Sequence, residues 1–183
     1  MTASGEGSSG RPPEVASPAI DVLGWLADNR ELIDRGAAGP VIGGGELNVL
    51  LVEGRGPRRD YHVNSVAELF YQLRGDIVVS VRQPGRVRDI LVRTGELWIA
   101  PAGVPHSPQR PVGSLGMVVE RAREPGTTEA FRWFCAACDA VVFEVTGGHV
   151  QPAELRIGVA AFNASVAART CAACGTVVPG PGD

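Results

Sequence analysis

The amino-acid sequence predicts an all-β fold, a small barrel with flanking helices, and two observations support this prediction. Two runs rich in Val and Ile, residues 77–81 and 87–92, have the composition of buried strands. Pro84-Gly85 between these runs is a typical hairpin turn. In a small barrel alternate side chains point inward, so residues an even number apart on one strand share the lumen.

The N-terminal region is predicted to contain a tail and one helix. Residues 1–16 are rich in Gly, Ser and Pro, so we expect a disordered tail. Ser17-Pro18 offers an N-cap and a first-turn proline, and a helix is expected from there to Gly36. Its apolar face consists of Ile20, Leu23, Trp25, Leu26, Leu32 and Ile33. Residues 43–45 are three glycines, interpreted as a turn because no helix start follows them.

Two further strands and a change of pattern follow along the chain. Leu47 to Val52 is the first predicted strand, and Leu115 to Glu120 is a later one that ends before Glu124-Pro125-Gly126. Gln151 to Arg169 is Ala-rich and predicted to be mostly helical. We therefore expect a tail at 1–16, a barrel with an N-terminal helix at 17–130, and a C-terminal extension at 131–183.

Composition limits the classes of function. The chain has 183 residues, 44% of them hydrophobic, which is enough for a core. The net charge of −3 and the pI near 5.6 give no reason to expect nucleic acid or a membrane as partner. No apolar run is long enough to span a bilayer, and the N-terminus lacks the plan of a signal peptide. We expect a cytoplasmic protein, whose four cysteines do not form disulfides.

Two of the three histidines stand near one acid in the central region. His62 and Glu68 are six residues apart, so both would face the lumen if their strand were unbroken, and His106 would arrive from another strand pair. Two imidazoles and a carboxylate form the facial triad of non-haem Fe(II) oxygenases, with open positions for substrate and oxygen. The alternative is that they are ordinary barrel residues; His149 is interpreted as a loop residue.

The spacing around these residues resembles the paired motifs of the cupin family, a jelly-roll (double-stranded β-helix) barrel. Many cupins carry a second histidine two residues after the first, where this chain has Asn64, and this difference favours three ligands over four. The glycines and proline that fall in register are Gly56, Gly75, Gly95, Pro101 and Gly103.

All four cysteines belong to two CxxC pairs, separated by 32 residues. Cys135 with Cys138 and Cys171 with Cys174 predict a closed four-cysteine metal knuckle of the rubredoxin or zinc-ribbon kind. Such a site is structural, because four thiolates leave no position for a substrate. The alternatives are a redox pair, which would need a CxxC at the start of a βαβ helix, and chance pairs of buried thiols.

The chain also resembles the bacterial 3-hydroxyanthranilate 3,4-dioxygenase family, from about residue 19 to 178. The segments that carry the resemblance are RRDYHVNSVAELFYQLRGD, GELWIAPAGVPHSPQRPVGS, MVVER, FRWFCAAC and CAACG. It implies that His62, Glu68 and His106 bind Fe(II), and that the cysteines hold iron or zinc. Arg58, Arg110 and Glu120 match the family's active-site residues. Read alone, the arginines could be solvated loop residues and Glu120 part of a surface ion pair.

The implied reaction is the opening of 3-hydroxyanthranilate, or a ring-substituted analogue, with O2. The product would be 2-amino-3-carboxymuconate semialdehyde, the precursor of quinolinate in tryptophan and kynurenine degradation toward NAD. Arg58 and Arg110 would bind the substrate carboxylate or steady oxygen at the metal, and Glu120 would accept a hydrogen bond or a proton from the amine. The segment Ala37 to Glu46, less polar than in the family, suggests the substituted substrate. A homodimer is implied by the resemblance alone.

Two alternatives to this function stay open. The enzyme could act on a different aminophenol or catechol carboxylate, or the chain could be a non-catalytic metal-binding cupin that senses a small carboxylated ligand. A sensor needs no open metal positions and would keep its ligand after loss of His106.

Overall fold

The computed structural model describes residues 19–31, 41–42, 46–148, 150 and 152–180. The chain divides into two units, Met1–Arg30 and Glu31–Asp183, and each is described by itself. In the first unit helix α1 spans Val22–Asp28 and is capped by Asp21, whose carboxylate accepts hydrogen bonds from the N–H groups of Leu23 and Gly24. The prediction that the helix starts at Ser17-Pro18 is wrong, because residues 19–21 are not helical.

Several expectations concern residues outside these ranges. They are the disordered tail at 1–16, the helix end at Gly36, the turn at residues 43–45, most of the segment Ala37 to Glu46, and His149.

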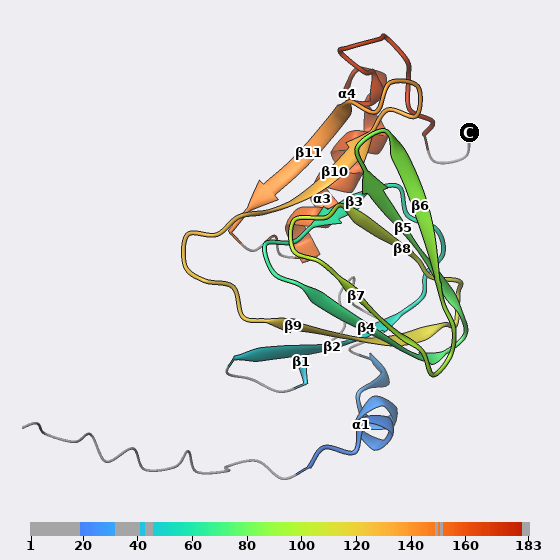
Figure 1. Cartoon of the computed structure of the whole chain (residues 1–183), viewed down its shortest axis with the longest axis vertical. Helices are drawn as coiled ribbons and strands as arrows, with labels where there is room; N and C mark the ends of the chain where they lie inside the picture. Colours follow the sequence, from blue (N-terminus) through green and yellow to red (C-terminus); the bar gives the residue numbers. More distant parts are fainter. Residues whose placement is uncertain (1–18, 32–40, 43–45, 149, 151, 181–183) are drawn as a thin grey trace, which may run out of the picture. The chain divides into compact units, whose positions relative to one another are not determined.

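The second unit contains two antiparallel sheets (Figure 1). The five-stranded sheet has, in spatial order, β1 (Val41–Ile42), β2 (Leu47–Glu53), β9 (Leu115–Arg121), β4 (Glu68–Arg74) and β7 (Leu97–Ala100). The six-stranded sheet has β11 (Val141–Gly147), β10 (Glu129–Phe134), β3 (Tyr61–Val63), β8 (His106–Gln109), β5 (Ile77–Gln83) and β6 (Arg86–Val92). The predicted all-β class with flanking helices is confirmed.

The predicted strands and their turn are confirmed with small extensions. Leu47–Glu53, Ile77–Gln83, Arg86–Val92 and Leu115–Arg121 contain the four predicted runs. Gly85 in the hairpin turn has φ of +71°, a conformation that glycine adopts without steric cost. The turn signal was reliable here because Pro84 and Gly85 interrupt a strand and so separate β5 from β6.

Alternate side chains of the central strands form the core, as a period of two requires. On β5 the buried residues are Ile77, Val79 and Val81, which pack with Val92 of β6. On the opposite sheet Phe70 packs with Ala100 and Val118. Glu68 and Gln72 occupy the same inward face of β4 as Phe70, so polar groups enter the core between apolar ones.

The C-terminal extension continues the six-stranded sheet. Strand β10 pairs with β3 on one side and with β11 on the other, and the expected boundary between 130 and 131 falls within it. Helices α3 (Pro152–Ala164) and α4 (Val166–Arg169) follow, as predicted for Gln151 to Arg169. Phe162 of α3 is fully buried against Trp133 and Phe143. Among the helices in the described part of the chain, none has the length and hydrophobicity needed to cross a membrane.

The contact between α3 and β11 provides a test of the packing. Gly158 faces Val145, and a Cβ at Gly158 would overlap the Val145 Cγ2 methyl. Alanine gains about 1 kcal/mol of helix propensity over glycine, whereas an extra methyl in a packed site costs about 1–3 kcal/mol. We expect Gly158→Ala to lower the free energy of unfolding by roughly 1 kcal/mol in urea denaturation. Ala160→Gly, at an exposed position of the same helix, measures the effect of helix propensity alone. A Gly158→Ala protein more stable than the unmodified protein would contradict the close contact between Gly158 and Val145.

Candidate metal centres

The two histidines come together through strand pairing. Strands β3 and β8 are neighbours in the six-stranded sheet, and His62 lies directly opposite His106 in their register. Glu68 begins β4 in the other sheet. The strand that was assumed to join His62 to Glu68 is therefore broken, and the two side chains meet across the two sheets. The expectation that His106 comes from a separate strand pair is also wrong.

The three side chains converge on one point. The Glu68 Oε2 atom lies 2.7 Å from His106 Nε2 and 3.3 Å from His62 Nδ1. One ligand atom from each residue lies within 4.8 Å of the others. All three residues are 9% exposed or less. Glu68 Oε2 is buried and makes no hydrogen bond of acceptable geometry within the described part of the chain. A buried carboxylate oxygen without a hydrogen-bond donor needs a cation, so these residues fit a metal ion.

The partners of the remaining ring nitrogens assign the histidine tautomers. His106 Nδ1 lies 2.9 Å from the Val104 carbonyl oxygen and donates to it, which leaves Nε2 facing Glu68. His62 Nε2 lies 2.9 Å from Glu129 Oε2, which leaves Nδ1 facing Glu68. Both histidines thus direct their second ring nitrogen toward the same space while an outer hydrogen bond fixes each ring.

The shifted pKa values of Glu68 and His62 indicate a site that favours positive charge. Burial disfavours the charged form of Glu68, but His106 and His62 outweigh it and lower the Glu68 pKa well below its usual range. Burial likewise lowers the pKa of His62, but Glu129 and Glu68 raise it to about 9. A divalent cation would replace the His62 Nδ1 proton, because metal-binding imidazoles are neutral.

The two predicted arginines both interact electrostatically with the Glu68 carboxylate, which favours their charged form. Arg110 is buried, donates from Nη1 to Gln72 Oε1 at 3.2 Å, and has a pKa lowered to about 10 by burial and by the charge of Arg58. Arg58 forms an ion pair with Asp60. Burial lowers the pKa of Arg58, but Asp60 and Glu68 more than offset this, so the pKa is raised. The alternative of solvated loop arginines does not hold for Arg110.

Glu120 lies on the inward face of β9, opposite Glu68 in register. Its carboxylate accepts hydrogen bonds from Asn64 Nδ2 at 2.8 Å and from Arg123 Nη1 at 2.8 Å. The alternative of a surface ion pair does not hold for Glu120, because Glu120 is only 6% exposed. Sequence reasoning missed Arg123 and Glu129. The spacing of three between Glu120 and Arg123, and an acid opening the apolar strand EAFRWF, were the available signals.

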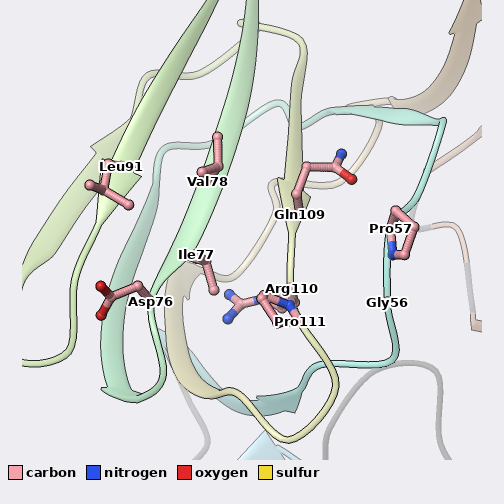
Figure 2. A pocket seen from close by; sticks show the side chains of 9 residues that line it. All are labelled: Gly56, Pro57, Asp76, Ile77, Val78, Leu91, Gln109, Arg110 and Pro111. Carbon is pink, nitrogen blue, oxygen red and sulfur yellow. The ribbon is translucent and has the colours of Figure 1, made fainter.

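A separate cavity of about 330 Å³ borders Arg110 (Figure 2). Figure 2 shows Arg110 beside Pro111 at the end of β8, with its guanidinium directed toward Ile77. The cavity is lined by Gly56, Pro57, Asp76, Ile77, Val78, Leu91, Gln109, Arg110 and Pro111. None of the three metal-binding candidates lines it, so it is not the space in front of the triad.

The four cysteines form a second cluster. The Cys135 sulfur lies 3.6 Å from that of Cys174, and the Cys138 sulfur 3.5 Å from that of Cys171. All four sulfurs lie within 4.8 Å of one another, and all four cysteines are free. A disulfide would bring two sulfurs to about 2.05 Å, whereas a tetrahedron with metal–sulfur bonds of about 2.3 Å has edges of about 3.8 Å. The spacing therefore fits a tetrahedral metal ion.

The two CxxC loops have the same backbone structure. The residue after the second cysteine has positive φ in both, 65° at Asp139 and 74° at Gly175. The N–H groups of these residues donate to the carbonyls of Cys135 and Cys171, at 3.0 and 2.8 Å. A turn of this kind orients both sulfurs of a pair to one side. The predicted knuckle therefore consists of one turn used twice, and the 32 intervening residues contain β11, α3 and α4.

The fold and the sites define a class: a β-barrel protein with a buried two-histidine, one-carboxylate cluster and a separate four-cysteine cluster. The family profile described as 3-hydroxyanthranilic acid dioxygenase matches residues 15–151. The chain belongs to this family.

Relatives named 3-hydroxyanthranilate 3,4-dioxygenase extend over most of the chain. That of Xanthomonas euvesicatoria pv. vesicatoria is 34% identical over 170 residues, covering 90% of this chain and 94% of the relative. That of the yeast Meyerozyma guilliermondii is 35% identical over 163 residues, covering 86% and 93%. Among solved structures, a cupin-2 domain protein from Shewanella frigidimarina is 21% identical, covers 53% of this chain and 92% of its own, and has a TM-score of 0.45.

Removing one thiolate tests the four-cysteine cluster. We expect Cys171→Ser to lower the bound metal by one atom per chain and to lower the melting temperature, because a structural metal contributes folding energy directly. Metal analysis by mass spectrometry and thermal denaturation measure the two effects. Thr170→Ser, which leaves all four sulfurs in place, is the control; full metal content in the Cys171→Ser protein would show that the cluster holds no metal.

Proposed function

We propose that this chain opens the ring of 3-hydroxyanthranilate with O2 at the His62–Glu68–His106 cluster, using Fe(II). Both oxygen atoms would enter the product, 2-amino-3-carboxymuconate semialdehyde, as the ring bond beside the hydroxyl-bearing carbon breaks. The observation that carries the proposal is the buried carboxylate of Glu68, which faces two imidazole nitrogens and lacks a hydrogen-bond donor among the described residues. The names of the relatives support the substrate.

The proposed metal is ferrous iron. Two nitrogens and one oxygen on the same side of the ion are the facial ligand set that such enzymes use. When bound, the iron supplies open coordination positions and the redox activity that allows O2 to react with the ring. The four-cysteine cluster would hold iron or zinc in a structural role.

We assign recognition of the substrate carboxylate to Arg58 and Arg110. A planar guanidinium binds a carboxylate through paired hydrogen bonds. Even with its pKa lowered to about 10, Arg110 keeps its charge at neutral pH, and Gln72 holds its side chain in place. The charge of Arg58 is neutralised by its ion pair with Asp60, so Arg110 attracts an anion more strongly than Arg58 does.

We assign Glu120 to the substrate amine. Its inward position opposite Glu68 supports an approach to a molecule bound in front of the cluster. The ion pair with Arg123 orients the Glu120 carboxylate, so it suits the acceptance of a hydrogen bond from the amine. Transfer of the amine proton to Glu120 is the alternative role.

The chain is further proposed to act in the cytoplasm as a homodimer. Four free thiols in one cluster support a reducing compartment. Leu97 and Ile99 alternate on β7 with the inward Trp98 and Ala100 and are 60% and 52% exposed, which supports a partner on that face. Light scattering after size exclusion measures the oligomeric state.

The central experiment loads the protein with Fe(II) under anaerobic conditions and then adds O2 with 3-hydroxyanthranilate. We expect stoichiometric O2 uptake and the absorbance of the ring-opened product. His106→Ala should reduce both to background, because one of three ligands is lost. Glu144→Ala, a change to an exposed ion pair on β11, is the control and should keep full activity.

The same assay separates the alternatives. Turnover of 3-hydroxyanthranilate at ordinary efficiency, with no gain for methylated or halogenated rings, would remove the idea of a substituted substrate. Activity only with another aminophenol or catechol carboxylate would favour that enzyme. Tight ligand binding without O2 uptake, retained in His106→Ala, would favour a sensor.

A single methyl group tests the role of Arg110. A Cβ at Gly116 would lie 2.5 Å from Arg110 Nη1 and 2.7 Å from Gln72 Oε1. Gly116→Ala should displace the guanidinium from its bond to Gln72, at a cost of about 1–3 kcal/mol for the added methyl. We expect KM for 3-hydroxyanthranilate to rise by about tenfold, as for one lost charge-assisted hydrogen bond of about 1.5 kcal/mol, with unchanged metal content. An unchanged KM would exclude Arg110 from carboxylate binding.

A further inference from the structure

A continuous chain of buried charged groups lies behind His62. Glu129 Oε2 is 2.9 Å from His62 Nε2 and accepts a hydrogen bond from Arg123 Nη2 at 2.7 Å. Arg123 also donates to both oxygens of Glu120, from Nη1 at 2.8 Å and from Nη2 at 3.2 Å. Asn64 completes the chain by its bond to Glu120. One end of this chain is a predicted metal ligand and the other is the predicted substrate acid.

The groups are too deeply buried for a surface ion network. The side chains of Glu129, Glu120 and Arg123 are 1%, 6% and 9% exposed. Breaking a buried pair by removing one partner is strongly destabilising, whereas an exposed pair contributes little to stability. A guanidinium between two carboxylates also satisfies both acids at once, because its planar donors reach in two directions.

The position of the His62 ring depends on this chain. Phe131 stacks on its face, with ring centroids 4.4 Å apart and planes at 5°. Stacking fixes the plane of the ring but permits rotation within that plane. The hydrogen bond to Glu129 stops this rotation, since Glu129 is itself held by Arg123 and by the Val150 N–H. The direction of the Nδ1 lone pair is thus set by Glu129.

We propose that Glu129 and Arg123 are positioning residues, which hold the metal ligand His62 and the substrate acid Glu120 in one fixed arrangement. The hydrogen bond to Glu129 orients the His62 ring so that Nδ1 faces the metal position. Arg123 binds both Glu129 and Glu120, so the orientation of Glu120 is coupled to that of His62. This proposal rests on the proposed metal cluster. Outer carboxylates of this kind change the affinity of a metal site by about 10–100-fold.

The test measures metal binding without turnover. The four-cysteine cluster is first loaded with Zn(II), and Mn(II) is then titrated while the EPR signal of free Mn(II) reports the unbound fraction. We expect Glu129→Gln, which keeps the shape but loses the charge, to weaken Mn(II) binding by about tenfold, and Glu129→Ala by up to about 100-fold. Glu144→Gln, the same change in an exposed pair of the neighbouring strand, should leave Mn(II) binding unchanged.

Arg123→Met tests the other half of the arrangement. We expect the KM for 3-hydroxyanthranilate to rise by about tenfold through Glu120, with a smaller loss of Mn(II) affinity than in Glu129→Gln. Mn(II) affinity and KM within twofold of the unmodified protein, in folded Glu129→Gln and Arg123→Met proteins, would overturn the proposal. Circular dichroism establishes folding, and if Glu129→Ala does not fold, Glu129→Gln decides the outcome. Mn(II) binding that persists in His106→Ala would instead refute the metal cluster itself.

Discussion

The structure depends on the burial of one carboxylate, that of Glu68, between two histidines. A buried unpaired charge costs several kcal/mol, and neither imidazole reaches Glu68 Oε2 with hydrogen-bond geometry. Positive charge at the point where the three side chains converge offsets this cost, and either a protonated His62 or a bound cation can supply it. The antiparallel pairing of β3 with β8 is what brings His62 and His106 to that point, and β4 supplies the acid from the other sheet.

The charges of the interior follow from this constraint. Glu68, Glu120 and Glu129 are three buried acids, and Arg123 together with a divalent cation would balance them. Asp60 is paired with Arg58, so Arg110 is left as the positive charge in excess. An interior of this kind attracts a small molecule with one negative charge, which is the charge of an aromatic amino acid such as 3-hydroxyanthranilate bound through its neutral amine and hydroxyl.

The sequence predicted the elements that depend on local signals. Strands bounded by glycine or proline, the Pro84-Gly85 turn and the repeated CxxC loops were found because backbone conformation near them is decided within a few residues. The three residues of the candidate metal cluster were predicted from residue type and motif spacing, and the structure brings them together, although His62 and Glu68 do not share an unbroken strand. The break between residues 63 and 68 places Glu68 in the other sheet, but the same three side chains still come together.

Contacts between strands that are distant in the sequence could not be predicted from local signals. Glu129 and Arg123 reach His62 and Glu120 because β9 and β10 lie close to β3. The periodicity within a single segment does not predict how strands are arranged relative to one another. The start of α1 shows the same limit on a small scale. Ser17 and Asp21 are both acceptable N-caps, and the choice between them depends on the structure rather than on capping preference.

The four-cysteine cluster is far from the first cluster in the sequence, but it lies next to a strand that reaches the first cluster. Cys135 directly follows β10, the strand that carries Phe131 and Glu129 to His62. The connection between β10 and the first cysteine loop is reinforced by Arg82 of β5. Arg82 pairs with Asp139 in that loop, and its guanidinium lies 4.3 Å from the Phe134 ring centroid. A strand with a loose end could shift in register and would move the groups that hold His62. A metal ion bound by the four cysteines would fix the end of β10, and would thereby stabilise the orientation of His62 in the other cluster without touching it.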